Sequence, residues 1–202
     1  MLLWAAVVLL LLFVIMDVSY FIRGTLVFAR GLLRPPIRDI LQELTLGGRV
    51  LATDVDFFGH MNNGRYLRQC DLGRIDVNTR NGILKTAQAL GANLVVGAST
   101  IRYRRSLKFL EPYKLRTRFI AWDDKAFYLE QRFLSARDGF VCAVMLCQQN
   151  VSRSTPDKIM QHLCKRKVES PDFPEELQHW IKYNTANSKK LKAEQEMEEK
   201  LD

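Results

Sequence analysis

The sequence has few of the residues that build metal and disulfide sites. It contains four cysteines and three histidines in 202 residues, and no two cysteines form a Cys-x-x-Cys pair. Structural zinc sites usually depend on such closely spaced pairs, so we expect no metal centre. Cys70, Cys142 and Cys147 lie in apolar periodic segments, and we expect them to be buried and reduced. Reduced cysteines favour a domain that faces the cytosol.

Several motifs of catalysis and nucleotide binding are also missing. The chain has no glycine-rich phosphate loop, no serine nucleophile turn and no His-Glu-x-x-His sequence. Nothing therefore indicates a P-loop nucleotide hydrolase, an α/β-hydrolase or a zinc protease. We also expect no cofactor. No internal repeat is visible, which excludes a solenoid.

Positive charge is spread along the chain instead of being concentrated. The formal net charge is +8, but acidic residues interleave with the basic ones. No recognised nucleic-acid-binding motif accompanies this charge, so we expect no nucleic-acid partner. A basic surface that lies near an anionic membrane face is the better-supported interpretation.

Charge is absent from the beginning of the chain. Leu2–Met16 is uninterrupted apolar sequence, and Val18–Ile22 extends it beyond Asp17. Together they have the length of a membrane span, which takes about 20 residues. Arginines follow this run and none precedes it, which favours an uncleaved anchor with a cytosolic domain at the endoplasmic reticulum membrane. The alternative is a cleaved signal and a secreted protein. Residues 1–22 are thus assigned to a signal-anchor or signal segment, and residues 23–48 to a basic linker.

The body of the chain contains one long helical pattern among several strand patterns. A short strand is expected over residues 49–53 and a helix from 64 to about 79, with Tyr66, Cys70, Gly73 and Val77 on its buried face. Two of these four residues are small, so the helix can approach a sheet closely. Four strands are expected over residues 92–104, 113–122, 126–136 and 140–151, joined by tight turns. The sequence therefore predicts an α+β fold with one long helix packed on a curved antiparallel sheet. Residues 154–202 are expected to form a helical extension that ends in a polar tail.

A polar cluster occupies the junction between the first strand and the helix. Asp56 and His60 lie in the connecting loop, and Asn62 and Asn63 are natural N-caps of the helix. The positive end of the helix dipole would point back at this loop. Such a combination can polarise a carbonyl group and activate a water molecule. The plainer alternative is that Asp56 caps a turn, His60 bonds the backbone and the asparagines only cap the helix.

The order of these elements, together with His60-Met61-Asn62-Asn63, resembles the hotdog-fold acyl thioesterases. The familiar enzymes of this family are the 4-hydroxybenzoyl-CoA and acyl-ACP thioesterases. The resemblance covers residues 49 to about 152. It implies a hotdog fold for residues 49–153 and a homodimer with sites at the interface. It also implies an acyl-CoA-like small molecule as the ligand.

The resemblance implies roles for individual residues. Asp56 would be the catalytic base or nucleophile, and His60 would orient the substrate or water. Amides at the helix start, near Asn62, Asn63 and Gly64, would polarise the thioester carbonyl. Independently of the resemblance, the cations Arg104, Arg105, Lys108 and Arg116 could meet phosphates of a CoA-like ligand, or they form a solvated basic edge.

The chain departs from the acyl-ACP thioesterase pattern at two positions. Phe58 replaces the asparagine of the Asp-x-Asn-x-His pattern, and Ser106 replaces the acid that follows Arg104-Arg105. Asp56 is then the one strong candidate base. Two functions follow as alternatives: hydrolysis of fatty acyl-CoA thioesters at the membrane, or non-catalytic binding of acyl-CoA or lipid. A secreted protein with another binding role is a third.

Overall fold

The computed structural model describes residues 1, 4, 7–8 and 17–199. Helix α2 (Val18–Leu33) leads to strand β1 (Leu44–Arg49) and to a short 3-10 turn, η1 (Ala52–Asp54). The long helix α3 (Asn63–Arg80) and the short helix α4 (Ile83–Ala89) come next. The remaining strands are β2 (Asn93–Tyr103), β3 (Pro112–Trp122), β4 (Ala126–Ser135) and β5 (Val141–Ser152). Two helices follow, α5 (Pro156–Cys164) and α6 (Glu175–Glu198).

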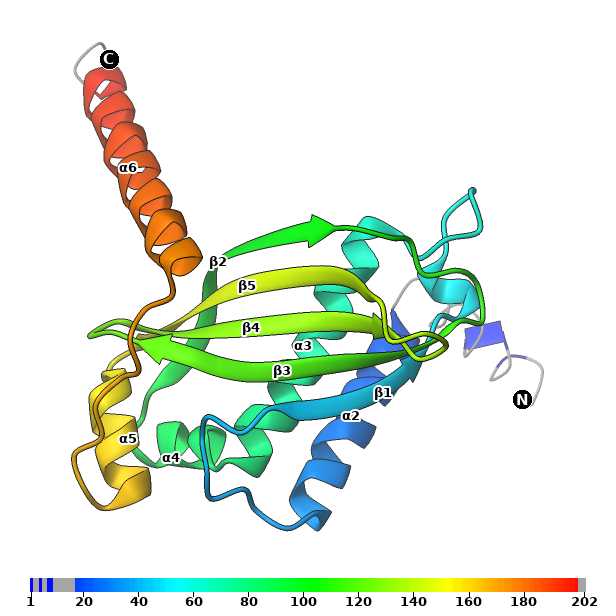
Figure 1. The fold of residues 1–202 in the computed structure, drawn as a ribbon, viewed down its shortest axis with the longest axis horizontal. Helices are drawn as coiled ribbons and strands as arrows, with labels where there is room; N and C mark the ends of the chain where they lie inside the picture. The colour runs from blue at the N-terminus through cyan, green and yellow to red at the C-terminus, as the bar shows by residue number, and fades with distance from the viewer. Residues whose placement is uncertain (2–3, 5–6, 9–16, 200–202) are drawn as a thin grey trace.

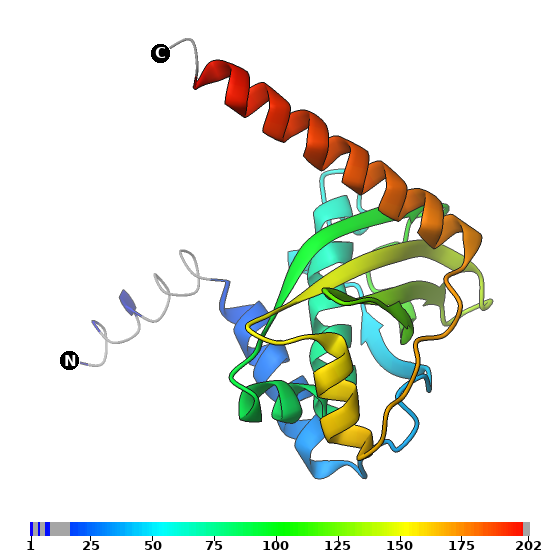
Figure 2. The same cartoon turned by 90° about the vertical axis from the view of Figure 1, so that its left-hand side faces the viewer.

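The strands form one antiparallel sheet in the order β1-β3-β4-β5-β2 (Figure 1). The sheet curves around α3, and α2 lies on the other side of this helix (Figure 2). The predicted α+β fold, with one long helix on a curved antiparallel sheet, is therefore confirmed. Alternate residues of β3 are buried as expected, because one face of this strand covers the core under α3.

The first strand is the element that the sequence placed wrongly. β1 ends at Arg49, where the expected strand over residues 49–53 was to begin. Its position is determined by pairing, since Leu46 lies opposite Leu115 and Arg49 opposite Pro112 of β3. After β1 the chain turns through η1 instead of continuing as a strand.

Helix α3 lies unusually close to the sheet at Gly73. A Cβ atom at this position would lie 2.6 Å from Thr117 Oγ1 and 2.8 Å from Gln131 Nε2. Tyr66, Cys70 and Gly73 are all buried, as the expected face of the helix requires. The small residues of this face therefore allow the close contact that the sequence predicted.

The apolar run Leu2–Met16 lies outside the described residues except for Trp4, Val7 and Val8. Asp17 caps α2, so Val18–Ile22 belong to a helix that packs on α3. Within residues 1, 4, 7–8 and 17–199, no helix combines the length and the apolar character needed to cross a membrane.

The C-terminal region is helical, as expected. Thr155 caps α5, and Pro156 occupies its first turn. Helix α6 buries Leu177 against the outer face of the sheet and then projects away from the body of the molecule (Figures 1 and 2).

Candidate functional site

The loop between η1 and α3 is a tight hairpin that brings Asp56 close to His60. Val55 pairs with Met61, and the Asp56 amide donates to the His60 carbonyl at 3.0 Å. Gly59 closes the turn with a left-handed φ of 72°, which glycine adopts without strain. Phe57 and Phe58 form the exposed tip of the hairpin. Asp56 and His60 are thus neighbours across the hairpin, as a shared site requires.

The Asp56 carboxylate is half-buried and supports the turn. Its Oδ1 atom accepts a hydrogen bond from the Phe58 amide at 2.9 Å. In the described part of the chain, its other oxygen makes no hydrogen bond or ion pair. One oxygen therefore caps the turn, and the second is available to a water molecule or a substrate.

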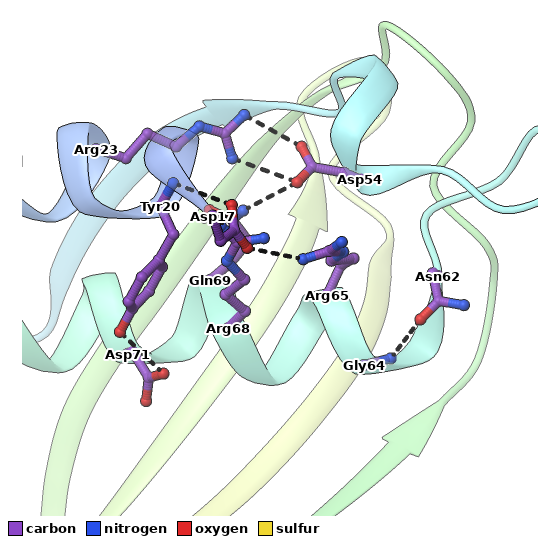
Figure 3. Close-up of polar contacts among 10 residues, drawn as sticks. All are labelled: Asp17, Tyr20, Arg23, Asp54, Asn62, Gly64, Arg65, Arg68, Gln69 and Asp71. Carbon is purple, nitrogen blue, oxygen red and sulfur yellow. Dashed lines mark hydrogen bonds and ion pairs between the residues drawn. The ribbon is translucent and has the colours of Figure 1, made fainter. Parts of the chain in front are cut away.

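Asp54 has a structural role that its position beside Asp56 does not reveal. Its side chain is 1% exposed and accepts hydrogen bonds from the two terminal guanidinium nitrogens of Arg23, at 3.2 and 3.4 Å (Figure 3). It also accepts hydrogen bonds from the Leu51 amide at 2.9 Å and from Gln69 at 3.4 Å. These bonds join α2, η1 and α3 directly behind the hairpin.

The start of α3 is capped by Asn62, as the sequence predicted. Asn62 Oδ1 accepts from the Gly64 amide at 3.0 Å (Figure 3). The Gly64 amide is therefore occupied in this state, whereas the Asn63 amide makes no hydrogen bond among the described residues. Tyr103 at the end of β2 donates to the Asn63 carbonyl at 2.8 Å, which places the edge of the sheet beside the helix start.

A second loop, between β2 and β3, packs against the hairpin and hydrogen-bonds to it. The Met61 amide donates to the Leu107 carbonyl at 2.8 Å, and His60 pairs with Lys108. Glu111 holds this second loop through the Lys108 amide at 3.0 Å and the Ser135 hydroxyl at 2.6 Å. Burial alone would raise the pKa of Glu111, but these hydrogen bonds outweigh it and lower the pKa.

The two arginines proposed for phosphate binding have different surroundings. Arg105 forms a two-pronged ion pair with Asp138, at 2.7 and 2.8 Å, and lies over the Phe140 ring. Arg104 also lies over Phe140, but in the described residues it forms no ion pair. Arg104 lines a groove of about 430 Å³ on the outer face of the sheet, together with Arg102 and Arg132. Arg104 donates to the Val141 carbonyl at 3.3 Å but has no carboxylate partner among the described residues, so of the two it is the one whose charge is available to a phosphate group.

Chemically, the hairpin provides a carboxylate with one free oxygen, an imidazole nearby and an unbonded amide at a helix start. This set suits attack of water on a carbonyl carbon whose oxygen needs a hydrogen-bond donor. Positions 58 and 106 hold phenylalanine and serine, so neither provides a second carboxylate beside Asp56. Arg23, Asp17 and Arg68 carry no local sequence signal of a role beside this site. Asp17 pairs with Arg65 at 3.3 Å and with Arg68, which fastens α2 to the first turns of α3 (Figure 3).

Sequence comparison shows what this chain is similar to. The model of the family described as "Thioesterase-like superfamily" matches residues 50–181. Protein THEM6 of Danio rerio is 54% identical over 200 residues, and the match covers 99% of this chain and 99% of that protein.

Solved structures with the same fold are more distant in sequence. The gentisyl-coenzyme A thioesterase BH1999 is 20% identical with a TM-score of 0.52, covering 58% of this chain and 96% of its own. The hypothetical protein SAV2348 from Staphylococcus aureus, solved in complex with CoA, is 17% identical with a TM-score of 0.53, covering 69% of this chain and 94% of its own. These matches show that the fold is the hotdog fold.

Proposed function

Because this chain belongs to the thioesterase-like superfamily, we propose that it hydrolyses fatty acyl-CoA thioesters at the membrane of the endoplasmic reticulum. The observation that carries this proposal is the hairpin geometry. Asp56 keeps one carboxylate oxygen free, within a few residues of His60 and of the Asn63 amide. The CoA bound by SAV2348 supports a ligand of this class.

In the proposed reaction, the free oxygen of Asp56 acts as a general base toward a water molecule. The water adds to the thioester carbonyl carbon, and the Asn63 amide donates a hydrogen bond to the carbonyl oxygen as negative charge develops there. His60 orients the water or the thioester. Collapse of the adduct breaks the carbon–sulfur bond, which gives a fatty acid and the thiol of CoA. Arg104 contacts a phosphate of CoA from the outer face of the sheet.

Two features favour a second candidate function, the binding of acyl-CoA or lipid without turnover. One oxygen of Asp56 already caps the hairpin through the Phe58 amide. Positions 58 and 106 provide no second carboxylate, since they hold phenylalanine and serine. A protein of this kind would keep the fold and the ligand but lack efficient chemistry.

We also propose that the protein is a homodimer that pairs through β2. This edge strand has 11 residues and is exposed on both faces, including the apolar side chains of Val95 and Val96. An exposed edge of this length carries unpaired backbone groups that can pair with a strand of another chain. The bond from Tyr103 to Asn63 places the start of α3 beside β2. A second copy on β2 would therefore lie next to the candidate site and help to enclose it.

Membrane attachment is proposed through the N-terminal segment and α2. Exposed apolar side chains extend along α2, among them Phe21, Leu26 and Leu33. Phe57 and Phe58 at the tip of the hairpin are also exposed apolar side chains. This arrangement is typical of a helix that lies in a membrane interface.

Activity is tested with the full-length protein in neutral detergent micelles. Thiol release is measured over a range of acyl-CoA chain lengths, for the unmodified protein and for Asp56→Asn. We expect the substitution to lower kcat by roughly 10²–10⁴, the usual contribution of a general base. Asp39→Asn is the matched control, because Asp39 is an exposed aspartate outside the hairpin.

Each outcome of this assay selects one function. Turnover that depends on Asp56 supports hydrolysis, and turnover that survives Asp56→Asn refutes the role of Asp56. Saturable acyl-CoA binding without turnover supports the binding function.

A glycosylation acceptor added at the C-terminus tests location, since its modification would show a lumenal or secreted domain and overturn the cytosolic assignment.

A further inference from the structure

A cavity of about 760 Å³ lies at the end of α3 opposite the hairpin. The end of α2, residues 34–40, the α3–α4 junction and the end of α5 line it, and it is open to solvent on one side. Its volume is within the usual range for small-molecule sites. Thr79 in its wall is roughly 24 Å along the helix axis from Asn63, at 1.5 Å per residue. Of the described residues, none from 56–64 lines it, so it is separate from the candidate thioester site.

The lining divides into an apolar part and a cationic part. Aliphatic and aromatic side chains form the first part: Phe28, Leu32, Ile37, Ile40, Leu84 and Leu163. Five cations form the second part: Arg34, Arg38, Arg80, Lys85 and Arg166. No aspartate or glutamate belongs to the described lining, and within the described chain none of the five cations has an ion-pair partner within 4.0 Å.

Three residues of the same wall hold buried polar atoms without a hydrogen-bond partner. These atoms are Thr79 Oγ1, Arg80 Nε and Asn81 Nδ2. Asn81 is 4% exposed, and its Oδ1 atom already accepts from the Ile83 amide at 3.0 Å. All three remaining atoms can donate a hydrogen bond. Because these atoms are buried, they do not reach the open lining, and the groups there that an acceptor with negative charge can meet are the five cations.

One acidic side chain faces these cations from inside the protein. The buried Asp76 carboxyl interacts electrostatically with Arg80, Arg34 and Arg30. Burial raises the pKa of Asp76 despite these three arginines, which favours its neutral form. Arg38, Lys85 and Arg166 are not compensated by it.

We propose that this cavity binds a single-chain anionic amphiphile. The acyl chain would lie along Phe28, Leu32 and the other apolar residues, and the carboxylate or phosphate head would meet the cations of the lining. Helix α2 contributes Phe28 and Leu32 to the cavity and also carries the exposed apolar residues proposed to face the membrane. The ligand can therefore enter from a lipid surface. This site is additional to the proposed thioester site and does not require turnover.

The proposal is tested by displacement of a fluorescent fatty acid from the full-length protein in neutral detergent micelles. The competitors are palmitate, palmitoyl lysophosphatidate and uncharged monopalmitoylglycerol. We expect both anions to displace the probe at concentrations roughly tenfold or more below that of monopalmitoylglycerol. If palmitate displaces the probe at the lower concentration, the preferred headgroup is a carboxylate; if palmitoyl lysophosphatidate does, it is a phosphate. Equal displacement by all three would overturn the proposal.

Variants locate the binding. Arg38→Gln with Lys85→Gln should weaken both anions by roughly tenfold or more, since it removes two exposed cations of the lining. Lys114→Gln with Lys182→Gln removes the same charge elsewhere on the surface and should change the affinity by less than about twofold. Leu84→Glu should abolish binding by placing an acid in the apolar part. Unchanged affinity in the first variant, or loss of binding in Asp56→Asn, would refute this location. Melting followed by circular dichroism confirms that each variant is folded.

Discussion

Replacement of Arg23 with glutamine should loosen the hairpin that carries Asp56. Arg23 and Asp54 form an ion pair in which the side chains are 21% and 1% exposed, respectively. Glutamine keeps much of the aliphatic stem and removes the charge. Asp54 would then remain buried with the Leu51 amide and Gln69 as its partners.

The magnitude follows from this geometry. Removal of one partner from a fully buried ion pair costs about 3–5 kcal/mol of unfolding free energy. The two nitrogen–oxygen distances here are long, at 3.2 and 3.4 Å, and Arg23 is partly exposed. We therefore expect a loss of about 2–3 kcal/mol, which lowers the Tm by roughly 5–10 °C.

The measurement is urea and thermal unfolding of the full-length protein in detergent, with Arg65→Gln as the matched control. Arg65 pairs with Asp17, and these side chains are 38% and 44% exposed, so its loss should cost at most about 1 kcal/mol. A double-mutant cycle with Asp54→Asn should give a coupling of about 1.5 kcal/mol or more between Arg23 and Asp54. Equal destabilisation by Arg23→Gln and Arg65→Gln would refute the reasoning.

Three further changes test other parts of the fold. Gly73→Ala should cost about 1–3 kcal/mol in urea unfolding, because the new Cβ would lie 2.6 Å from Thr117 Oγ1; unchanged stability would contradict the close helix–sheet contact. Glu111→Gln should destabilise the protein at neutral pH, and the difference should shrink in melts as the pH falls below about 4.5. The reason is that the lowered pKa of Glu111, held down by Ser135, stabilises the fold only while the carboxylate is ionised. Asp76→Asn should act in the opposite sense, because a raised pKa in the folded state means that stability is lost as the pH rises through it. This variant should melt higher than the unmodified protein at neutral pH and equally below about pH 4, and a lower melting temperature at neutral pH would argue against it.

The parts of the fold that the sequence predicted are those with a strong local pattern. The alternation along β3 and the buried stripe of α3 each repeat over several turns or residues, so local periodicity identified them. Asn62 was likewise predicted as the cap of α3, because its side chain bonds an amide only two residues away. In each case the structure is determined by residues that lie close together in the sequence.

The parts that escaped prediction depend on contacts between distant segments. β1 contains Gly47 and Gly48, which are poor strand formers, and it is a strand because β3 pairs with it. Asp54 and Asp56 have the same side chain, and only the position of Arg23, 31 residues earlier, distinguishes a buried anchor from a half-exposed candidate base. The basic cavity also lacks a local signal, since α2, α3 and α5 each contribute part of it.

The projecting helix α6 affects how the size of this protein should be measured. It has 24 residues, which corresponds to roughly 36 Å of helix, and Leu177 is its one buried residue. A rod of this length on a small domain increases hydrodynamic friction, so a single chain should elute early in gel filtration, as a heavier globular protein would. Elution volume would then report a dimer whether or not β2 pairs with a second copy. Sedimentation equilibrium, which depends on mass and not on shape, is therefore the appropriate test of the proposed dimer.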